Sequence, residues 1–252
     1  MKLIATVRKG GGNFAFNLPT TETAMPVHIP NLLTQEQIST CRPLLEAGHW
    51  VDGRATAGVQ AVHAKKNLQL AADCEKAATV REVVLQALSS NLLFRGFALP
   101  RTIFPPLFNR YDGGMTYGAH VDNSVQTIPG SGGQLMRADL SATVFFNDPD
   151  DYEGGELELE TEAGLEMIKL PAGDMIIYPT TMIHRVTPVT TGSRLASFFW
   201  IQSLIPDHAS RKLLFSLDRA IIDLRARTEP GDAAVLSLTN TYHNLIRRWC
   251  DL

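Results

Sequence analysis

Three residues of this sequence have the side chains and spacing of an open metal site. His120 and Asp122 stand two residues apart in a segment whose composition favours a strand. Side chains at positions i and i+2 of a strand point to the same face, so these two can converge on one ion. His184 is a candidate third ligand. Two imidazoles and one carboxylate on one face of an ion suit ferrous iron with open positions opposite them.

The pair His120-x-Asp122 is weak evidence on its own, because most such pairs in strands are solvated or structural. The surrounding sequence decides between the possible metals. A structural zinc site is closed by four ligands, commonly including thiolates. The three cysteines are scattered, show no CxxC spacing and lie far from His120 in the sequence. A zinc hydrolase with Glu153 or Glu156 as its general base stays open at this stage.

Arg194 is the candidate cationic anchor of the same site. It follows His184 by ten residues, across a turn expected at 188–192, and this hairpin would place it beside the strand that carries His184. A buried arginine needs an anionic partner, because an unpaired buried charge is costly. Its guanidinium fork matches a carboxylate. The carboxylate could belong to a dicarboxylic co-substrate or to a side chain such as Asp174 or Glu156, and the sequence leaves both open.

The elements that must position these residues are short β-type runs separated by turn residues. The expected strands are Thr102–Tyr111, Thr116–Val121, Leu140–Asn147, Glu156–Glu160, Glu166–Leu170, Met175–Tyr178, His184–Pro188 and Arg194–Ser203. Short strands at this spacing favour a double-sheet jelly roll. The expected fold is therefore mainly β with flanking helices, around a double-stranded β-helix (jelly roll) core at 99–204.

Helical and mixed segments flank this expected core. We expect an N-terminal extension at 1–26, a helical and strand support region at 27–98 and a C-terminal helical segment at 205–252. In the support region, Thr34 and Gln37 form a capping-box pattern, Pro43 predicts a break or kink, and an apolar stripe begins at Val80. Two further stripes beyond Pro206 predict two helices separated by Pro230-Gly231. These helices could pack on the barrel or join subunits of a homo-oligomer.

Composition narrows the class of protein. The net charge of −3 gives no reason to expect nucleic acid, and no basic run predicts binding to an anionic membrane. No stretch approaches the length of a membrane span, and the N-terminus lacks the apolar run of a secretory signal. Three cysteines without a framework fit a reducing cytoplasm. We expect a cytoplasmic protein that binds neither nucleic acid nor membrane.

Three longer motifs carry a resemblance to a known family. They are Phe108–Asn123, which ends in Gly-Ala-His-Val-Asp-Asn, Asp139–Leu157, which contains Tyr-Glu-Gly-Gly-Glu-Leu, and Leu170–Pro179. Together these runs resemble the Fe(II)/2-oxoglutarate dioxygenases of the prolyl/lysyl-hydroxylase-domain type, most closely the bacterial PKHD-type hydroxylases. The resemblance extends from about residue 29 to the helices after Pro206, and residues 1–26 look like an extension outside it.

The resemblance implies roles for individual residues. His120, Asp122 and His184 would be the iron ligands, and Arg194 would bind the distal carboxylate of 2-oxoglutarate. Further co-substrate or pocket contacts are expected from Tyr111, Thr143, Tyr178 and Trp200. The second tyrosine of animal prolyl hydroxylases is replaced here by Phe145, which has no hydroxyl. Thr143, Tyr178 or a water could substitute for it.

The reaction implied by the resemblance is hydroxylation of an unactivated C–H bond by O2, with release of succinate and CO2. Expected cofactors are Fe(II) and the co-substrate 2-oxoglutarate, with L-ascorbate as an accessory. The substrate is a peptidyl proline or lysine or a small molecule, because kinship of fold does not fix it. A non-catalytic sensor or scaffold that binds metal or 2-oxoglutarate is the alternative. The Gly- and Ser-rich loop 124–137 is expected to act as a lid.

Overall fold

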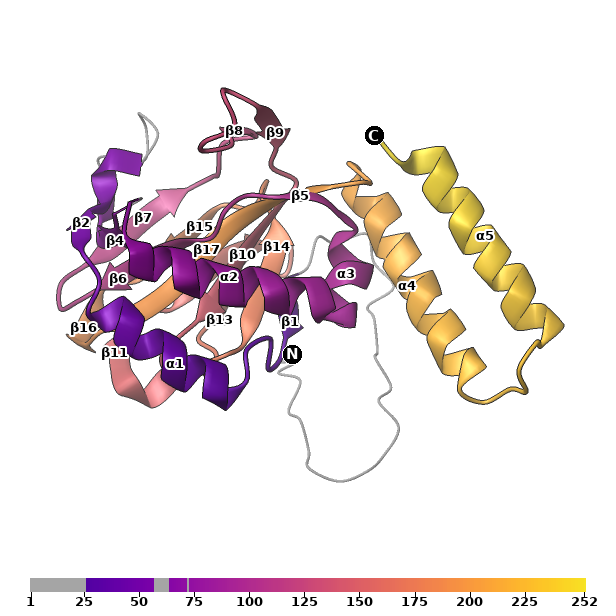
Figure 1. The fold of residues 1–252 in the computed structure, drawn as a ribbon, viewed down its shortest axis with the longest axis horizontal. Coiled ribbons are helices and arrows are strands. Elements are labelled where there is room, and N and C mark those ends of the chain that lie inside the picture. Colours follow the sequence, from indigo (N-terminus) through magenta and orange to yellow (C-terminus); the bar gives the residue numbers. More distant parts are fainter. Residues whose placement is uncertain (1–25, 57–63, 72) are drawn as a thin grey trace.

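Two antiparallel sheets form the centre of the molecule. The computed structural model describes residues 26–56, 64–71 and 73–252, and Figure 1 shows its arrangement. The larger sheet has the order β1 (Val27–Ile29), β14 (Met175–Pro179), β10 (Leu140–Phe145), β17 (Arg194–Ser203), β6 (Leu107–Tyr111), β4 (Leu68–Leu70) and β2 (Trp50–Asp52), and β5 (Pro100–Ile103) also pairs with β17. The smaller sheet has the order β13 (Gly164–Ile168), β12 (Leu157–Thr161), β15 (His184–Val186), β7 (Thr116–His120) and β3 (Lys65–Lys66).

Two strand pairs stand outside these sheets. They are β8 (Val125–Thr127) with β9 (Leu135–Arg137), and β11 (Tyr152–Gly154) with β16 (Val189–Gly192). Strands distant in sequence are neighbours in both large sheets, as the crossing connections of a jelly roll require. The predicted jelly-roll core with flanking helices is confirmed.

Side chains point alternately to the two faces of the larger sheet, and these faces have different surroundings. On β10, Leu140, Ala142 and Val144 belong to the hydrophobic core that this sheet shares with the N-terminal helices. The intervening Ser141 and Thr143 line the cavity between the sheets. Because successive side chains point to opposite faces, one strand contributes apolar residues to the core and polar residues to the cavity.

The N-terminal helices cover the outer face of the larger sheet. They are α1 (Gln35–Glu46), α2 (Glu75–Ser90) and α3 (Leu92–Ala98), and Figure 1 shows α1 and α2 lying across the strands. Thr34 accepts a hydrogen bond from the Gln37 backbone, and the Gln37 side chain accepts one from the Thr34 backbone, which confirms the predicted capping box. The predicted stripe from Val80 is the buried face of α2.

The C-terminal segment forms a helical pair at one side of the molecule. Helix α4 (His208–Arg225) and helix α5 (Ala233–Trp249) are separated by Pro230-Gly231, as predicted. Phe215 of α4 packs edge-on against Phe97 of α3, with ring centroids 5.4 Å apart. No helix in the described part of the chain is both long enough and apolar enough to cross a membrane.

Several local predictions were wrong. The single strand expected at 102–111 is split into β5 and β6 around Pro105 and Pro106, which have no N–H for a ladder. Of the break or kink expected near Pro43, the break does not occur, because the helix continues to Glu46. It loses one backbone hydrogen bond there, while Leu45 beyond the proline is 1% exposed in the core. Packing outweighs the local penalty.

Other segments expected to be loops contain regular structure. Residues 124–137 contain the β8–β9 pair, and the turn expected at 188–192 forms β16, which pairs with β11. Short 3-10 helices occur at Gly53–Thr56 and Pro149–Asp151, and helix α3 was not predicted. The extension predicted at 1–26 lies outside the described residues except for Pro26.

Candidate metal centre

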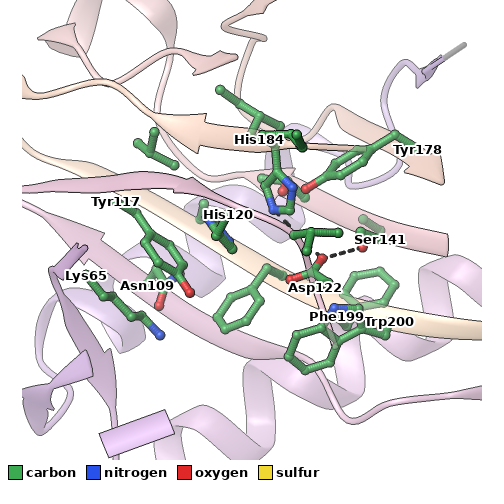
Figure 2. Close-up of a pocket in the computed structure, with 18 of the residues that line it drawn as sticks. Lys65, Asn109, Tyr117, His120, Asp122, Ser141, Tyr178, His184, Phe199 and Trp200 are labelled. Atoms are coloured by element: carbon green, nitrogen blue, oxygen red, sulfur yellow. Dashed lines mark hydrogen bonds and ion pairs between the residues drawn. The ribbon is translucent and has the colours of Figure 1, made fainter. Parts of the chain in front are cut away.

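A cavity of about 580 Å³ lies between the two sheets. Its wall combines residues of β6, β10, β14 and β17 from the larger sheet with residues of β7, β12 and β15 from the smaller one. Figure 2 shows the side chains that line it. A concave, partly apolar cavity of this size with a few convergent polar groups is typical of a small-molecule site.

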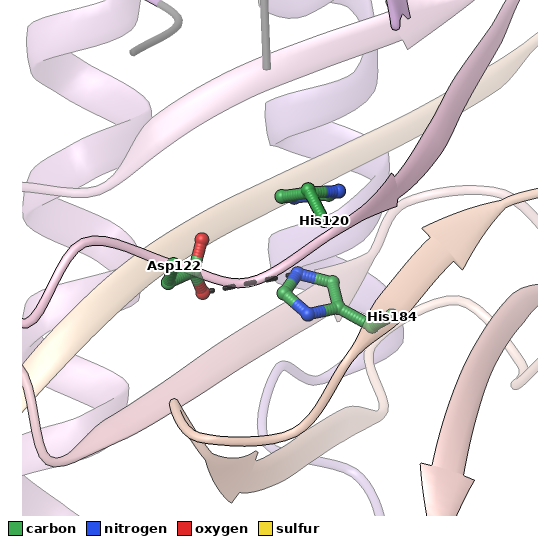
Figure 3. Close-up of side chains that lie close together, drawn as sticks. All are labelled: His120, Asp122 and His184. Atoms are coloured by element: carbon green, nitrogen blue, oxygen red, sulfur yellow. Dashed lines mark ion pairs between the residues drawn. The ribbon is translucent and has the colours of Figure 1, made fainter. Parts of the chain in front are cut away.

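His120, Asp122 and His184 meet in this cavity, as predicted. One ligand atom from each lies within 4.8 Å of the others, and Nε2 of His184 is 3.8 Å from Oδ2 of Asp122 (Figure 3). The pairing of β7 with β15 explains the convergence, because His120 and His184 are direct partners across these strands.

Hydrogen bonds hold both histidines in one orientation. Nδ1 of His120 lies 2.8 Å from the backbone oxygen of Gly118, and Nδ1 of His184 lies 3.0 Å from that of Met182. Since a carbonyl oxygen only accepts, each Nδ1 carries a proton, and Nε2 is the ring nitrogen left to bind a metal. The hydroxyl of Ser141 donates to Oδ2 of Asp122 at 2.6 Å.

Burial keeps His120 neutral. Desolvation is the largest cause that lowers its pKa, to about 4, and the neighbouring His184 lowers it further. The Tyr117 ring stacks on the imidazole at 3.7 Å between centroids. A neutral imidazole is the form that binds a metal ion.

Arg194 lines the same cavity and is only 2% exposed. Its guanidinium carbon lies 5.4 Å from the Tyr111 ring centroid and 5.2 Å from that of Phe145. Its Nε has no hydrogen-bond partner among the residues that the structure describes. A buried cation with an unused donor fits the carboxylate of a ligand.

Neither protein carboxylate considered for Arg194 pairs with it. Asp174 binds His28 at 2.7 Å, and Glu156 accepts a hydrogen bond from Thr187. The expected hairpin between His184 and Arg194 was also wrong. β15 belongs to the smaller sheet and β17 to the larger one, so His184 and Arg194 line the cavity from different sheets.

The other predicted site residues, Tyr111, Thr143, Tyr178 and Trp200, all line the cavity. Burial raises the pKa of Tyr178 well above its ordinary value, although a hydrogen bond with Thr143 opposes the shift. Tyr178 is therefore a neutral phenol that Thr143 orients. Trp200 packs edge-on against Phe198 with centroids 5.7 Å apart.

Sequence reasoning missed Tyr152, which provides a hydroxyl near Arg194. Burial raises the pKa of its phenol, while the charge of Arg194 lowers it. A side chain at Gly155 would contact both residues, at 3.0 Å from the Tyr152 ring and 3.2 Å from Cδ of Arg194. The Tyr152 hydroxyl is buried, and hydrogen bonding to the Arg194 side chain also lowers its pKa. It is a candidate for the hydroxyl that Phe145 lacks.

Ser141, Lys65 and Asn109 also line the cavity. The alternation of side chains along a strand could have identified Ser141 as a cavity residue, because Ser141 and Thr143 point to the same face of their strand. The spacing of the residues around Lys65 did not indicate a place in the cavity. No local signal indicated Asn109.

Comparisons with known proteins agree with this geometry. Residues 106–202 match the 2OG-Fe(II) oxygenase superfamily, and residues 208–251 match the PKHD-type hydroxylase C-terminal domain. A PKHD-type hydroxylase from Methylobacterium nodulans is 53% identical over 228 residues, which cover 90% of this chain and 100% of the relative. The chain belongs to the PKHD-type hydroxylases.

Solved structures share the fold at low identity. A Pseudomonas putida prolyl-4-hydroxylase is 16% identical with a TM-score of 0.50, and covers 71% of this chain and 93% of its own. The non-heme alpha ketoglutarate dependent carbocyclase SnoK from nogalamycin biosynthesis is 14% identical with a TM-score of 0.52, covering 80% and 94%. At this identity the likeness shows the jelly-roll fold alone.

The residues of this PKHD-type hydroxylase fit the groups that its superfamily uses. Two imidazoles and a carboxylate leave positions open for ferrous iron, and Arg194 offers an unused donor to a dicarboxylate. Neither of the general bases considered for a zinc hydrolase, Glu153 and Glu156, lines the cavity. Membership of an oxygenase superfamily also makes the chain an enzyme, and the sensor or scaffold alternative is set aside.

Proposed function

We propose that this 2OG-Fe(II) oxygenase hydroxylates an unactivated C–H bond of a peptidyl proline or lysine or of a small molecule, with O2 as oxidant and succinate and CO2 as co-products. The observation that carries the proposal is the presence of the His120–Asp122–His184 triad and Arg194 in one cavity. In this proposal the triad binds Fe(II) and Arg194 binds the distal carboxylate of 2-oxoglutarate.

Each group of protein residues has a distinct task in this proposal. The backbone oxygens of Gly118 and Met182 fix the histidine rings, and Ser141 fixes the Asp122 carboxylate. Ferrous iron with 2-oxoglutarate would supply O2 activation and oxidative decarboxylation. Phe198 and Trp200 would exclude water from the reacting C–H bond.

Arg194 and its neighbours would orient the co-substrate. Tyr111 and Phe145 contact the guanidinium through their rings, and Thr143 and Tyr178 lie on the adjoining wall. The Tyr152 hydroxyl beside Arg194 supports a second contact to the same carboxylate.

The test measures Fe(II) binding and succinate formation from 2-oxoglutarate by the purified protein. We expect His120→Ala and Asp122→Ala to lose both, and Arg194→Met to raise the KM for 2-oxoglutarate while keeping metal binding. His243→Ala, on the exposed face of α5, is the matched control. Succinate formation by the His120→Ala or Asp122→Ala variant would refute the proposal.

The substrate class needs a separate measurement. Proline- and lysine-containing peptides and small metabolites would be incubated with the enzyme and screened by mass spectrometry for the gain of one oxygen atom. Omitting L-ascorbate from the same assay tests its proposed accessory role. The three free thiols support a reducing cytoplasm as the compartment, which cell fractionation tests.

A further inference from the structure

A β-bulge interrupts the strand that carries His120. On β15, His184 and Val186 are two residues apart, whereas their partners on β7, His120 and Tyr117, are three apart, and the register shifts between the two pairs. β7 therefore holds one extra residue, as a bulge does. Side chains three apart on a regular strand point to opposite faces. Because of the bulge, Tyr117 and His120 both line the cavity.

Both polar groups of the Gly118 backbone hold this bulge in place. Its N–H donates to the backbone oxygen of Ala64 at 2.8 Å, and its own oxygen lies 2.8 Å from Nδ1 of His120. A Cβ at position 118 would stand 2.9 Å from Cβ of Ala64, so the close approach of Ala64 favours glycine here. The residue that forms the bulge thus also orients a candidate metal ligand.

The Tyr117 ring lies flat against the His120 imidazole. Their centroids are 3.7 Å apart, and their planes differ by 18°. The tyrosine ring has a second neighbour, because Nζ of Lys65 lies 5.2 Å from its centroid, within the range of a cation–π contact. Figure 2 shows Tyr117 between Lys65 and His120. These two contacts restrain the tyrosine ring itself.

The two histidines differ in how their surroundings hold them. His184 is 6% exposed, and Tyr178 packs against it edge-on with centroids 5.2 Å apart. His120 is only half-buried, so packing restrains it less. The hydrogen bond from Nδ1 of His120 to Gly118 fixes one ring atom and leaves the imidazole free to tilt about that bond. A ring stacked on its face opposes this tilt.

We propose that Tyr117 is a positioning residue of the metal centre. Its ring, brought to the cavity by the bulge, fixes the plane of the His120 imidazole so that Nε2 points at the ion. The aromatic ring produces this effect, and the hydroxyl is not needed for it. This inference rests on the proposed function, because it assumes that the triad binds a metal ion.

The test measures Co(II) binding to the metal-free protein, because the visible spectrum of Co(II) depends on the arrangement of its ligands. Tyr117→Leu keeps an apolar side chain that cannot stack. We expect this variant to bind Co(II) about tenfold more weakly and with a changed spectrum, since groups that orient a ligand contribute to metal affinity on this scale. Tyr117→Phe keeps the ring and is expected to retain both the affinity and the spectrum of the wild-type protein.

Tyr242→Leu is the matched control. Tyr242 of α5 is also half-buried and also contacts a histidine, His243, with centroids 5.5 Å apart, but it does not line the cavity. This variant should leave the affinity for Co(II) and the spectrum unchanged. Thermal unfolding shows whether each variant is folded, and Tyr117→Met replaces Tyr117→Leu if the latter does not fold.

Three results would overturn the inference. Wild-type affinity and spectrum in folded Tyr117→Leu would show that the hydrogen bond to Gly118 is enough to hold His120. An equal loss in Tyr117→Phe would assign the effect to the hydroxyl. Absence of Co(II) binding by the wild-type protein would remove the ion that Tyr117 is proposed to serve.

Failure of the proposed function has a different signature. Succinate formation from 2-oxoglutarate by the wild-type protein with Fe(II) is measured in parallel. A wild-type protein that binds Co(II) but forms no succinate would count against the proposed function, while the comparison of Tyr117→Leu with Tyr117→Phe would still decide the role of the ring.

Discussion

At the scale of single residues, the hydrogen bonds behind the three candidate ligands set how well they hold one ion. Ser141 donates to the Asp122 oxygen that faces His184. Without this bond the carboxylate can rotate, and ligand geometry that is not fixed in advance weakens metal binding. Side chains that touch no metal therefore contribute to the centre.

Ser141→Ala removes this contact with little change in volume. We expect metal affinity to fall by about 10- to 100-fold, measured by titration with Mn(II) or Fe(II). Ser89→Ala, an exposed serine on α2, is the control. Equal affinity in the Ser141→Ala and wild-type proteins would show that other contacts hold Asp122.

The metal-free protein should lose stability as the pH falls from about 6.5 to about 4. The pKa of His120 is lowered from 6.5 to about 4 by burial. The unfolded chain takes up this proton near pH 6.5, whereas the folded chain does so only near pH 4, so acid favours unfolding between these values. Thermal unfolding across this range measures the effect.

His120→Gln should flatten this pH dependence, because glutamine does not titrate. The control is His243→Gln, which removes an exposed histidine of α5. An unchanged slope in His120→Gln would assign the acid sensitivity to other groups.

At the scale of elements, the β11–β16 pair supports the end of the cavity that holds Arg194. Gly154 and Gly155 lie where β11 ends, and Gly155 approaches both Tyr152 and Arg194. Gly154 has a φ of +69°, and a Cβ there would stand 2.0 Å from the backbone oxygen of Pro188. Only glycine permits this approach of two backbones.

Gly154→Ala is expected to destabilise the fold more than Gly130→Ala does, measured by urea denaturation. Gly130 is the matched control, since its φ is +74° and no atom lies within 4 Å of its added Cβ. Strain from the left-handed backbone alone costs about 1–2 kcal/mol, so Gly130→Ala should lose that much. Similar losses in both variants would show that Pro188 moves aside easily.

At the scale of the whole molecule, the C-terminal helices are tied to the main core. Phe215 is 3% exposed and belongs to the same hydrophobic cluster as the N-terminal helices. Asp251, beyond α5, accepts a hydrogen bond from Arg137 at 2.8 Å, at the end of β9. The structure therefore connects the last residues to the strand pair near the cavity.

Phe215→Ala should destabilise the protein by about 3–5 kcal/mol, because it leaves a cavity against Phe97. Denaturant unfolding measures this loss. Leu236→Ala is the control, since Leu236 is 68% exposed, and it should change stability by less than about 0.5 kcal/mol. A small loss in Phe215→Ala would mean that α4 contributes little to the core.

The homo-oligomer expected through the C-terminal helices stays a prediction. The stripe on α5 is half-buried at Leu238, Tyr242 and Trp249. Sedimentation of the full chain would measure the mass of the assembly, and a monomer at high concentration would contradict the prediction.

The sequence by itself determined the jelly-roll class, the two C-terminal helices and the candidate triad with Arg194. These follow from relations between residues close in sequence, such as the i and i+2 spacing of His120 and Asp122, or from motifs shared with a family. The exceptions were of two kinds, one local and one due to packing. Pro105 and Pro106 split one expected strand into β5 and β6. Burial of Leu45, in contrast, stabilises the turn of α1 that lies beyond Pro43.

Only the tertiary structure decided which side chains meet. It paired His184 with His120, and it put Arg194 on the opposite sheet. It also brought Lys65 of the smaller sheet and Asn109 of the larger sheet into the same cavity. Strand pairing between distant segments depends on how the whole chain buries its apolar faces, and that free energy is not encoded in the spacing of a few residues.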